Sequence, residues 1–212
     1  MNGFCYIVGA GDFFEERPFE LTKADFLIAA DGGLRHLRGR APDLLIGDFD
    51  SLGEPAFSGE TFRLPKEKDE TDLLAAIREG ISRGYRKFLI FGATGGRFGH
   101  TFANLQCLSY LKRRGCRGWI FDSTCVMTVI SGESVRFPAG FCGYFSAFSI
   151  TDRSRVTETG FAYSVSGKTL ENGYPLGVSN EFTGAEAEIR AEEGEILILY
   201  ERRNLASYDR VL

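Results

Sequence analysis

The sequence lacks the features that mark several large classes of protein. Its 212 residues include no apolar run long enough to span a membrane, two histidines without HxxxH spacing, and five cysteines without CxxC spacing. These absences argue against a transmembrane helix and against a zinc site. The net charge of −4 also lacks the basic excess of nucleic-acid-binding surfaces. We therefore expect neither a membrane nor a nucleic acid as partner, and any metal should be a hard ion with oxygen ligands.

The chain also shows no secretory signal, because its first apolar stretch ends at Gly9 before any basic region or longer apolar run begins. We therefore expect a cytoplasmic protein. Several cysteines lie inside apolar segments, where cysteine behaves as a small hydrophobic residue. The prediction is that all five are reduced core residues: Cys5, Cys107, Cys116, Cys125 and Cys142.

The first half of the chain alternates buried strands with amphipathic helices, which predicts a mostly parallel sheet covered on both faces. The expected strands are Phe4–Val8, Phe26–Ala30, Leu44–Ile46, Phe88–Phe91 and Gly118–Phe121. Apolar residues at helical spacing predict helices over Thr71–Arg83 and His100–Arg113, the second with Phe102, Leu105, Leu108 and Leu111 along one stripe. We assign residues 1–124 to this α/β domain.

The second half, residues 125–212, changes to short alternating segments separated by glycine, serine, asparagine and aspartate. This pattern predicts a small antiparallel β domain, either a sandwich or a barrel. The expected strands are Val126–Ile130, Val135–Phe137, Tyr144–Ile150, Phe161–Val165, Glu186–Ala191 and Glu195–Tyr200.

The strongest chemical signal is Gly47-Asp48-Phe49-Asp50-Ser51, which follows an apolar strand. In an extended chain, residues i and i+2 point the same way, so Asp48 and Asp50 should project together from the carboxyl end of that strand. Open α/β sheets bind ligands at this edge. Two close carboxylates favour a cation between them, and oxygen ligands favour Mg²⁺. The alternative is a solvated acidic turn.

Two further segments bring acids to the same edge. Asp31-Gly32-Gly33 also follows a strand, and Asp72 lies at the start of the Thr71 helix behind Lys66 and Lys68. Asp31, Asp48, Asp50 and Asp72 together predict a Mg²⁺ site on an enzyme that acts on nucleotide phosphates. For the last segment the alternative is helix capping, by Asp69 or Thr71.

A glycine-rich turn, Gly92 to Gly99, lies between a predicted strand and the helix that starts near His100. Backbone N–H groups in such a turn can hold phosphate, and Arg97 can bind phosphate oxygens with its guanidinium group. The turn lacks the Gly-Lys-Ser/Thr of a Walker A motif. The alternatives are an exposed arginine on a tight turn and a packed histidine. Gly9-Ala10-Gly11-Asp12 is a weaker signal of the same kind.

Taken together, these motifs resemble thiamine pyrophosphokinases (thiamine diphosphokinases) in order and spacing. The matching segments are Asp31–Gly33, Gly47–Ser51, Lys68–Asp72, Gly95–His100 with Asn104, Gly160–Tyr163 and Gly177–Phe182. The resemblance implies transfer of a pyrophosphoryl group from ATP to thiamine, giving thiamine diphosphate and AMP. It also implies an N-terminal α/β catalytic domain, a C-terminal β-sandwich that binds thiamine, and a homodimer with sites between subunits.

The resemblance also implies roles for individual residues. Asp31, Asp48, Asp50 and Asp72 would bind Mg²⁺ and support the reaction. Nucleotide binding would fall to Lys68, Asp69, Thr71, Gly95, Gly96, Arg97, His100 and Asn104. Thiamine binding would fall to Tyr163, Ser179 and Asn180. Two positions depart from the family pattern, because Gly99 replaces an aspartate and Ala162 replaces a lysine.

Two other functions compete with this one. The Asp48-Phe49-Asp50-Ser51 segment also resembles the nucleophile motif of haloacid-dehalogenase-like phosphatases, in which Asp48 would be phosphorylated. That motif normally ends the first strand, whereas here two predicted strands precede it. A nucleotide sensor that binds Mg-ATP without turnover is the second alternative, and absence of AMP formation would favour it.

Overall fold

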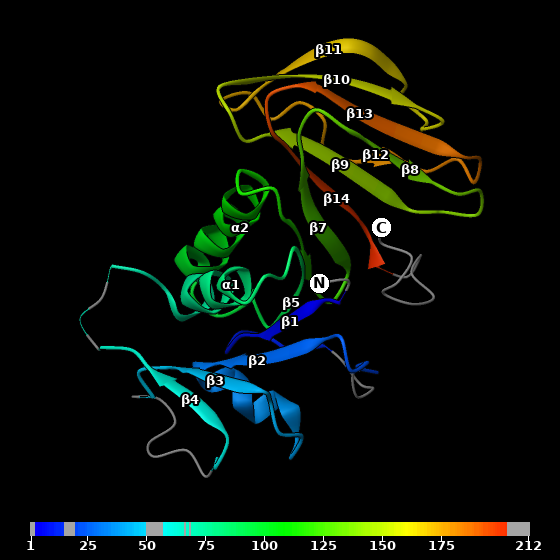
Figure 1. The fold of residues 1–212 in the computed structure, drawn as a ribbon. Coiled ribbons are helices and arrows are strands. Elements are labelled where there is room, and N and C mark those ends of the chain that lie inside the picture. Colours follow the sequence, from blue (N-terminus) through cyan, green and yellow to red (C-terminus); the bar gives the residue numbers. More distant parts are fainter. Residues whose placement is uncertain (1–2, 15–19, 50–56, 66, 68, 203–212) are drawn as a thin grey trace. The chain divides into compact units, whose positions relative to one another are not determined.

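The structure is a computed structural model that describes residues 3–14, 20–49, 57–65, 67 and 69–202 (Figure 1). The chain forms two compact units, Met1–Ser123 and Thr124–Leu212. None of the helices in these described ranges is both long and apolar enough to cross a lipid bilayer.

The first unit is built on a parallel sheet. Its strands are β1 (Cys5–Val8), β2 (Phe26–Ala30), β3 (Leu44–Gly47), β4 (Glu60–Arg63), β5 (Lys87–Phe91) and β6 (Arg117–Phe121). They lie in the order β6-β5-β1-β2-β3-β4, and every neighbouring pair is parallel. The five predicted strands are confirmed within one or two residues. β4 was not predicted, because this edge strand exposes all four of its residues and so carries no apolar pattern.

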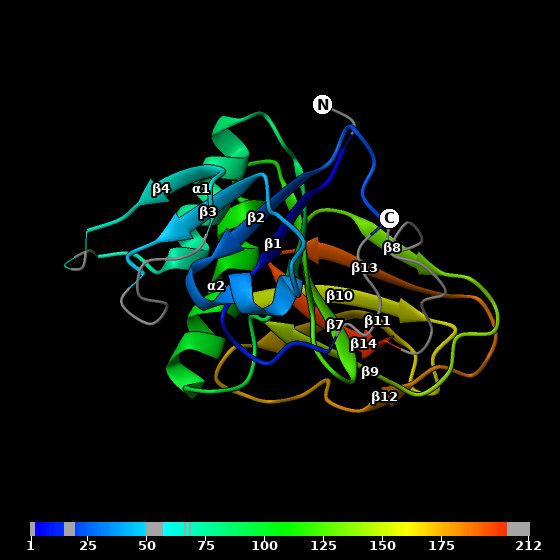
Figure 2. The ribbon, with the colours of Figure 1, turned by 90° about the horizontal axis from the view of Figure 1, so that it is seen from below.

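Two α-helices, α1 (Asp72–Ser82) and α2 (Phe98–Lys112), cover one face of this sheet, and the 3₁₀ helix η1 (Asp31–Leu37) covers the other (Figures 1 and 2). Both α-helices lie where the apolar spacing predicts them. The predicted stripe on α2 was wrong at Phe102, whose side chain is 55% exposed. The helix instead buries the face formed by Asn104, Cys107, Leu108 and Leu111, which also follows i, i+3, i+4, i+7 spacing.

The described part of the second unit, residues 124–202, forms eight strands: β7 (Cys125–Ile130), β8 (Ser134–Phe137), β9 (Tyr144–Ser149), β10 (Arg153–Thr159), β11 (Val165–Glu171), β12 (Asn180–Glu181), β13 (Ala187–Glu193) and β14 (Ile196–Glu201). They form two antiparallel layers, β12-β9-β14-β7 and β11-β10-β13-β8. The ring of Phe137 on β8 lies 5.8 Å from that of Phe145 on β9 and 5.2 Å from that of Tyr200 on β14. The layers therefore pack face to face over an aromatic core, which confirms the β-sandwich.

Two predictions for this unit fail locally. Residues 161–164 are a turn and not a strand, and Val165 is the first residue of β11. The turn is joined to β12 and the residue after it, since the Ala162 amide donates to the Glu181 carbonyl and Phe161 forms a bridge with Phe182. The strands β10 and β11 were missed because neither has an apolar face: β10 buries Ser154 and Glu158 beside Val156, and most residues of β11 are exposed. The strand β12 was missed because it is only two residues long.

Of the five cysteines predicted as core residues, Cys142 is exposed and Cys125 is half-buried, whereas Cys5, Cys107 and Cys116 are buried as expected.

Candidate functional site

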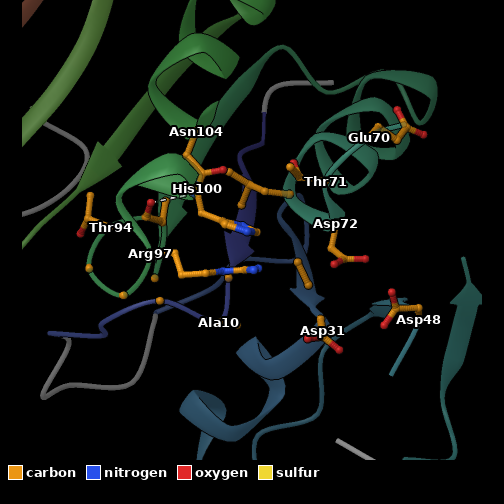
Figure 3. A pocket seen from close by; sticks show the side chains of 18 residues that line it. Ala10, Asp31, Asp48, Glu70, Thr71, Asp72, Thr94, Arg97, His100 and Asn104 are labelled. Atoms are coloured by element: carbon orange, nitrogen blue, oxygen red, sulfur yellow. Dashed lines mark hydrogen bonds between the residues drawn. The ribbon is translucent and has the colours of Figure 1, made fainter. Parts of the chain in front are cut away.

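A cavity of about 630 Å³ opens at the carboxyl ends of the parallel strands (Figure 3). The segments that follow β1, β2, β3 and β5 line it, together with the first turns of α1 and α2. The chain runs outward from β1 to β4 and then returns to β5 on the other side of β1. The loops after β1 and β5 therefore diverge at a topological switch point, where open α/β sheets bind their ligands.

Backbone hydrogen bonds join these two loops into one floor of the cavity. The amides of Gly9, Gly11 and Asp12 donate to the carbonyls of Phe91, Gly92 and Thr94, each at 2.8 Å. Glycine is required here, since a Cβ on Gly92 (φ +62°) would lie 2.3 Å from the Gly9 carbonyl oxygen. The sequence pattern gave little weight to Gly9–Gly11, although a glycine pair directly after a strand is a recognisable signal for such a loop.

Three of the four predicted aspartates lie on one side of this cavity. Asp31 begins η1 directly after β2, Asp48 follows β3, and Asp72 is the first residue of α1. Figure 3 shows their carboxylates around the same hollow. Asp31 adopts a left-handed backbone (φ +46°), which is uncommon outside glycine and clusters at functional sites. Asp50, the fourth predicted aspartate, falls outside the described residues.

No three His, Cys, Asp or Glu side chains among the described residues form a group that could hold a metal ion by themselves. This does not conflict with Mg²⁺ chemistry, because that ion commonly uses one or two carboxylates together with water and substrate phosphates. The oxygen-only donors of Asp31, Asp48 and Asp72 fit a magnesium ion that is shared with a phosphate ligand.

In the segment before α1, Thr71 caps the helix and also lines the cavity, and its neighbours differ in whether they reach the cavity. Thr71 is the N-cap, since its hydroxyl accepts a hydrogen bond from the Leu74 amide at 3.2 Å. Thr71 also lines the cavity, as does Glu70, whose carboxylate pairs with Arg78 at 2.8 Å. Asp69 is exposed and is not among the lining residues, and Lys68 falls outside the described residues.

The side of the cavity opposite the aspartates is polar and cationic. Gly95, Gly96, Arg97 and His100 line it, and Figure 3 shows the side chains of Arg97 and His100 extending into the hollow. No described side chain caps the N-terminus of α2, and its first turn contains no acid. The helix dipole therefore adds positive potential next to Arg97, an arrangement that suits phosphate.

Asn104 lines the cavity from the buried face of α2 and is 9% exposed. Its side-chain amide donates to the Ala93 carbonyl at 2.7 Å, so it holds the glycine-rich turn against the helix. The Thr94 hydroxyl anchors the same turn by donating to Asp122 at 2.6 Å. Thr94 was not predicted as a site residue, because its partner lies 28 positions away in the sequence.

The three residues predicted to bind thiamine lie together in the second unit. Tyr163 is 70% exposed, on the turn between β10 and β11. The Tyr163 amide donates to the Asn180 side chain at 3.0 Å. Ser179 precedes Asn180 in a left-handed backbone (φ +58°) and donates its amide to the Ser146 hydroxyl at 3.0 Å. The exposed Tyr163 ring and the strained Ser179 therefore flank one buried asparagine.

Asn180 is itself joined to a buried carboxyl group that the sequence pattern did not single out. Its side-chain nitrogen donates to Glu158 at 2.7 Å, and the two side chains are 7% and 6% exposed. Burial raises the pKa of Glu158, and the hydrogen bond from Asn180 offsets part of that rise. An acid at an inward position of β10, two residues after Val156, is the signal that could have identified it.

Comparison with known families gives two matches along the chain. The family model "Thiamin pyrophosphokinase, catalytic domain" matches residues 19–120. The model "Thiamin pyrophosphokinase, vitamin B1 binding domain" matches residues 134–196. Together they cover more than half of the chain, each within one of the two compact units.

Solved structures agree with this result. A thiamin pyrophosphokinase from Geobacillus thermodenitrificans is 27% identical, with a TM-score of 0.80 over 93% of this chain and 97% of that one. The thiamine pyrophosphokinase from Bacillus subtilis shares the fold at 22% identity, with a TM-score of 0.84 over 94% and 99% of the two chains. The Candida albicans enzyme shares it at 12% identity and a TM-score of 0.76, over 94% and 89%. A comparison with curated protein sequences gave no significant match.

Proposed function

Because the chain belongs to the thiamin pyrophosphokinase family, we propose that it transfers the pyrophosphoryl group of ATP to the hydroxyethyl oxygen of thiamine. The products are thiamine diphosphate and AMP. The observation that carries this proposal for the chain's own residues is the two-sided cavity, with three aspartates facing Arg97, His100 and the N-terminus of α2.

ATP fits this cavity by charge. The triphosphate would lie between the two sides, with its oxygens accepting hydrogen bonds from Arg97, His100 and the backbone N–H groups at the start of α2. Gly95 and Gly96 leave the backbone of the turn accessible, since both adopt left-handed conformations without bulky side chains. Asn104 supports the turn from behind, so its effect on ATP binding would be indirect.

The aspartates would hold Mg²⁺ together with the phosphates. Asp31, Asp48 and Asp72 line the cavity, and Asp50 is the further ligand expected two residues after Asp48. When bound, Mg²⁺ would disperse the negative charge that develops on the phosphoryl oxygens.

The reaction forms a bond between the hydroxyethyl oxygen and the β-phosphorus while the bond from that phosphorus to the oxygen bridging to the α-phosphate breaks. AMP leaves with the bridging oxygen, and one of the cavity aspartates accepts the hydroxyl proton. Charge builds on the equatorial and leaving oxygens, where Arg97 and the α2 N-terminus face it. Catalysis of this kind depends mainly on positioning and electrostatic stabilisation.

Thiamine would be recognised by the second unit through Tyr163, Ser179 and Asn180. The exposed ring of Tyr163 offers an aromatic face to the pyrimidine ring, and its 70% exposure leaves that face accessible in the described structure. Ala162, at the position where the family carries a lysine, removes one charge from this turn.

The test measures AMP and thiamine diphosphate from purified protein with Mg-ATP, with and without thiamine. We expect the two products in equal amounts and only when thiamine is present. Inorganic phosphate release would support a phosphatase instead, and ATP binding without AMP formation would support a nucleotide sensor.

The metal assignment has its own test. Asp48→Asn and Asp50→Asn should each lower kcat by a factor on the order of 10² while circular dichroism stays unchanged. Asp152→Asn changes an exposed aspartate of the second unit in the same way and should leave the rate unaltered. Normal turnover in both Asp48 and Asp50 variants would overturn the assignment.

The resemblance also leads us to propose that the protein works in the cytoplasm as a homodimer. Sedimentation velocity of the purified chain should give the mass of two copies, and cell fractionation should recover the protein with soluble enzymes. A single 23.5 kDa species at every concentration would refute the dimer.

A further inference from the structure

The amide group of Asn180 has all four of its hydrogen-bonding positions occupied within the protein. Its nitrogen donates to Glu158 at 2.7 Å and to the Tyr163 carbonyl at 2.9 Å. Its oxygen accepts from the amides of Tyr163 at 3.0 Å and Glu181 at 2.9 Å. An asparagine side chain offers two donors and two acceptor positions, so no capacity remains for a ligand unless one of these bonds breaks.

These bonds hold the main chain of Tyr163 on both sides, through its N–H and its carbonyl. Neighbouring contacts extend the same connection, because the Ala162 amide donates to the Glu181 carbonyl at 2.9 Å and the Phe161 ring lies 5.1 Å from that of Phe182. The turn is thus fixed at its backbone while the Tyr163 ring remains 70% exposed.

Glu158 bonds to Asn180 through its side chain and lies on β10. The other partners of Asn180 are backbone groups of Tyr163, in the turn, and of Glu181, in β12. Glu158 lies on the same face of the strand as Ser154 and Val156, and all three residues are buried, so its carboxyl group points inward. A buried carboxyl group is unfavourable unless it is hydrogen-bonded, and Asn180 donates a hydrogen bond to Glu158. Without an acceptor at this place, one donor of the buried Asn180 amide would lose its hydrogen bond.

We propose that Glu158 is a positioning residue for thiamine, which acts through Asn180 to hold the backbone of Tyr163 and so present the Tyr163 ring to the substrate. In this arrangement the direct contacts fall to Tyr163 and Ser179, whereas Asn180 belongs to the support behind them. The inference rests on the proposed function for the identity of the ligand, but the mechanical link between Glu158 and Tyr163 does not.

The experiment compares two variants of the full-length chain with the wild type. Glu158→Leu removes the acceptor, whereas Glu158→Gln keeps an oxygen that can accept from Asn180. We expect Glu158→Leu to raise KM for thiamine at least tenfold with KM for ATP changed less than twofold, and Glu158→Gln to restore both constants to within about threefold of wild type. Equal changes in the two KM values would overturn the proposal.

A double variant tests whether the effect passes through the Tyr163 ring. Tyr163→Ala should itself raise KM for thiamine, and adding Glu158→Leu to it should cause less than a twofold further change. A further tenfold rise in the double variant would show that Glu158 acts by another route and would refute the proposal. If Glu158→Leu does not fold, Glu158→Asp replaces it, because the shorter side chain withdraws the acceptor by one methylene. Glu158→Asp should then raise KM for thiamine at least threefold, with KM for ATP changed less than twofold.

Hydrogen exchange separates this proposal from the proposed function. The Tyr163 amide should exchange at least tenfold faster in Glu158→Leu than in wild type or Glu158→Gln, whether or not the enzyme turns over thiamine. Absence of thiamine-dependent AMP formation in the wild type would reject the proposed function, whereas unchanged exchange at Tyr163 would reject the positioning role of Glu158.

Discussion

Two glycines in the glycine-rich turn after β5 allow one structural effect to be measured against a matched control. Gly92 and Gly96 adopt nearly the same left-handed backbone, with φ of +62° and +59°. They differ in their surroundings. A Cβ on Gly92 would lie 2.3 Å from the Gly9 carbonyl oxygen, whereas a Cβ on Gly96 meets no atom within 4 Å.

The expected magnitudes follow from this difference. A left-handed backbone costs an L-residue about 1–2 kcal/mol, and replacing glycine returns about 0.4–1 kcal/mol by restricting the unfolded chain. Gly96→Ala should therefore lower the free energy of unfolding by about 1 kcal/mol or less. Gly92→Ala must in addition displace the backbone of Gly9, and overpacking of this kind costs roughly 1–3 kcal/mol. The difference should be about 2 kcal/mol, or about 4–8 °C in Tm.

Calorimetric unfolding of the two variants and the wild type provides the measurement. Gly92→Ala should also weaken ATP binding, because the loops after β1 and β5 share the hydrogen bond from the Gly11 amide to the Gly92 carbonyl. Equal Tm values for the two variants would refute the argument, since the close approach of Gly9 and Gly92 would then carry no energetic consequence.

Three further predictions follow from single side chains. Thr71→Ala should lower the free energy of unfolding by about 1 kcal/mol through loss of the α1 cap, measured by denaturant titration, whereas Thr71→Ser should stay within a few tenths. Because burial raises the pKa of Glu158, its protonated form favours folding, and this stability is lost as pH rises through the folded-state pKa. Glu158→Gln should therefore have a higher Tm than wild type at pH 8 and an equal one near pH 4, and a pH-independent difference would contradict this. Iodoacetamide should label the exposed Cys142 within minutes but should not label the buried Cys5 and Cys107, since burial raises the pKa of the Cys107 thiol to about 11. Mass spectrometry of the modified peptides identifies which cysteines have reacted, and rapid labelling of Cys107 would contradict the prediction.

The fold was predictable where each element carries its own pattern. Long apolar runs identified the five inner parallel strands, and helical spacing identified α1 and α2. The missed strands, β4, β10, β11 and β12, are rich in polar residues and are strands because a neighbouring strand satisfies their backbone. Phe102 shows the same limit on a helix, since apolar spacing allowed two faces and packing against the sheet selected the one containing Asn104.

The candidate site, like the fold, was predictable from the sequence only in part. The sequence by itself predicted that Asp31 and Asp48 would lie at one edge of the sheet, because each directly follows a parallel strand, and Asp72 joins them from the N-terminus of α1. Tertiary structure decided the rest. Only the return of the chain to β5 beside β1 brings Gly9 against Gly92, and only the turn after β10 brings Glu158 to Asn180. Such contacts join positions far apart in the chain, and no local pattern encodes them because their energy exists only after the strands have paired.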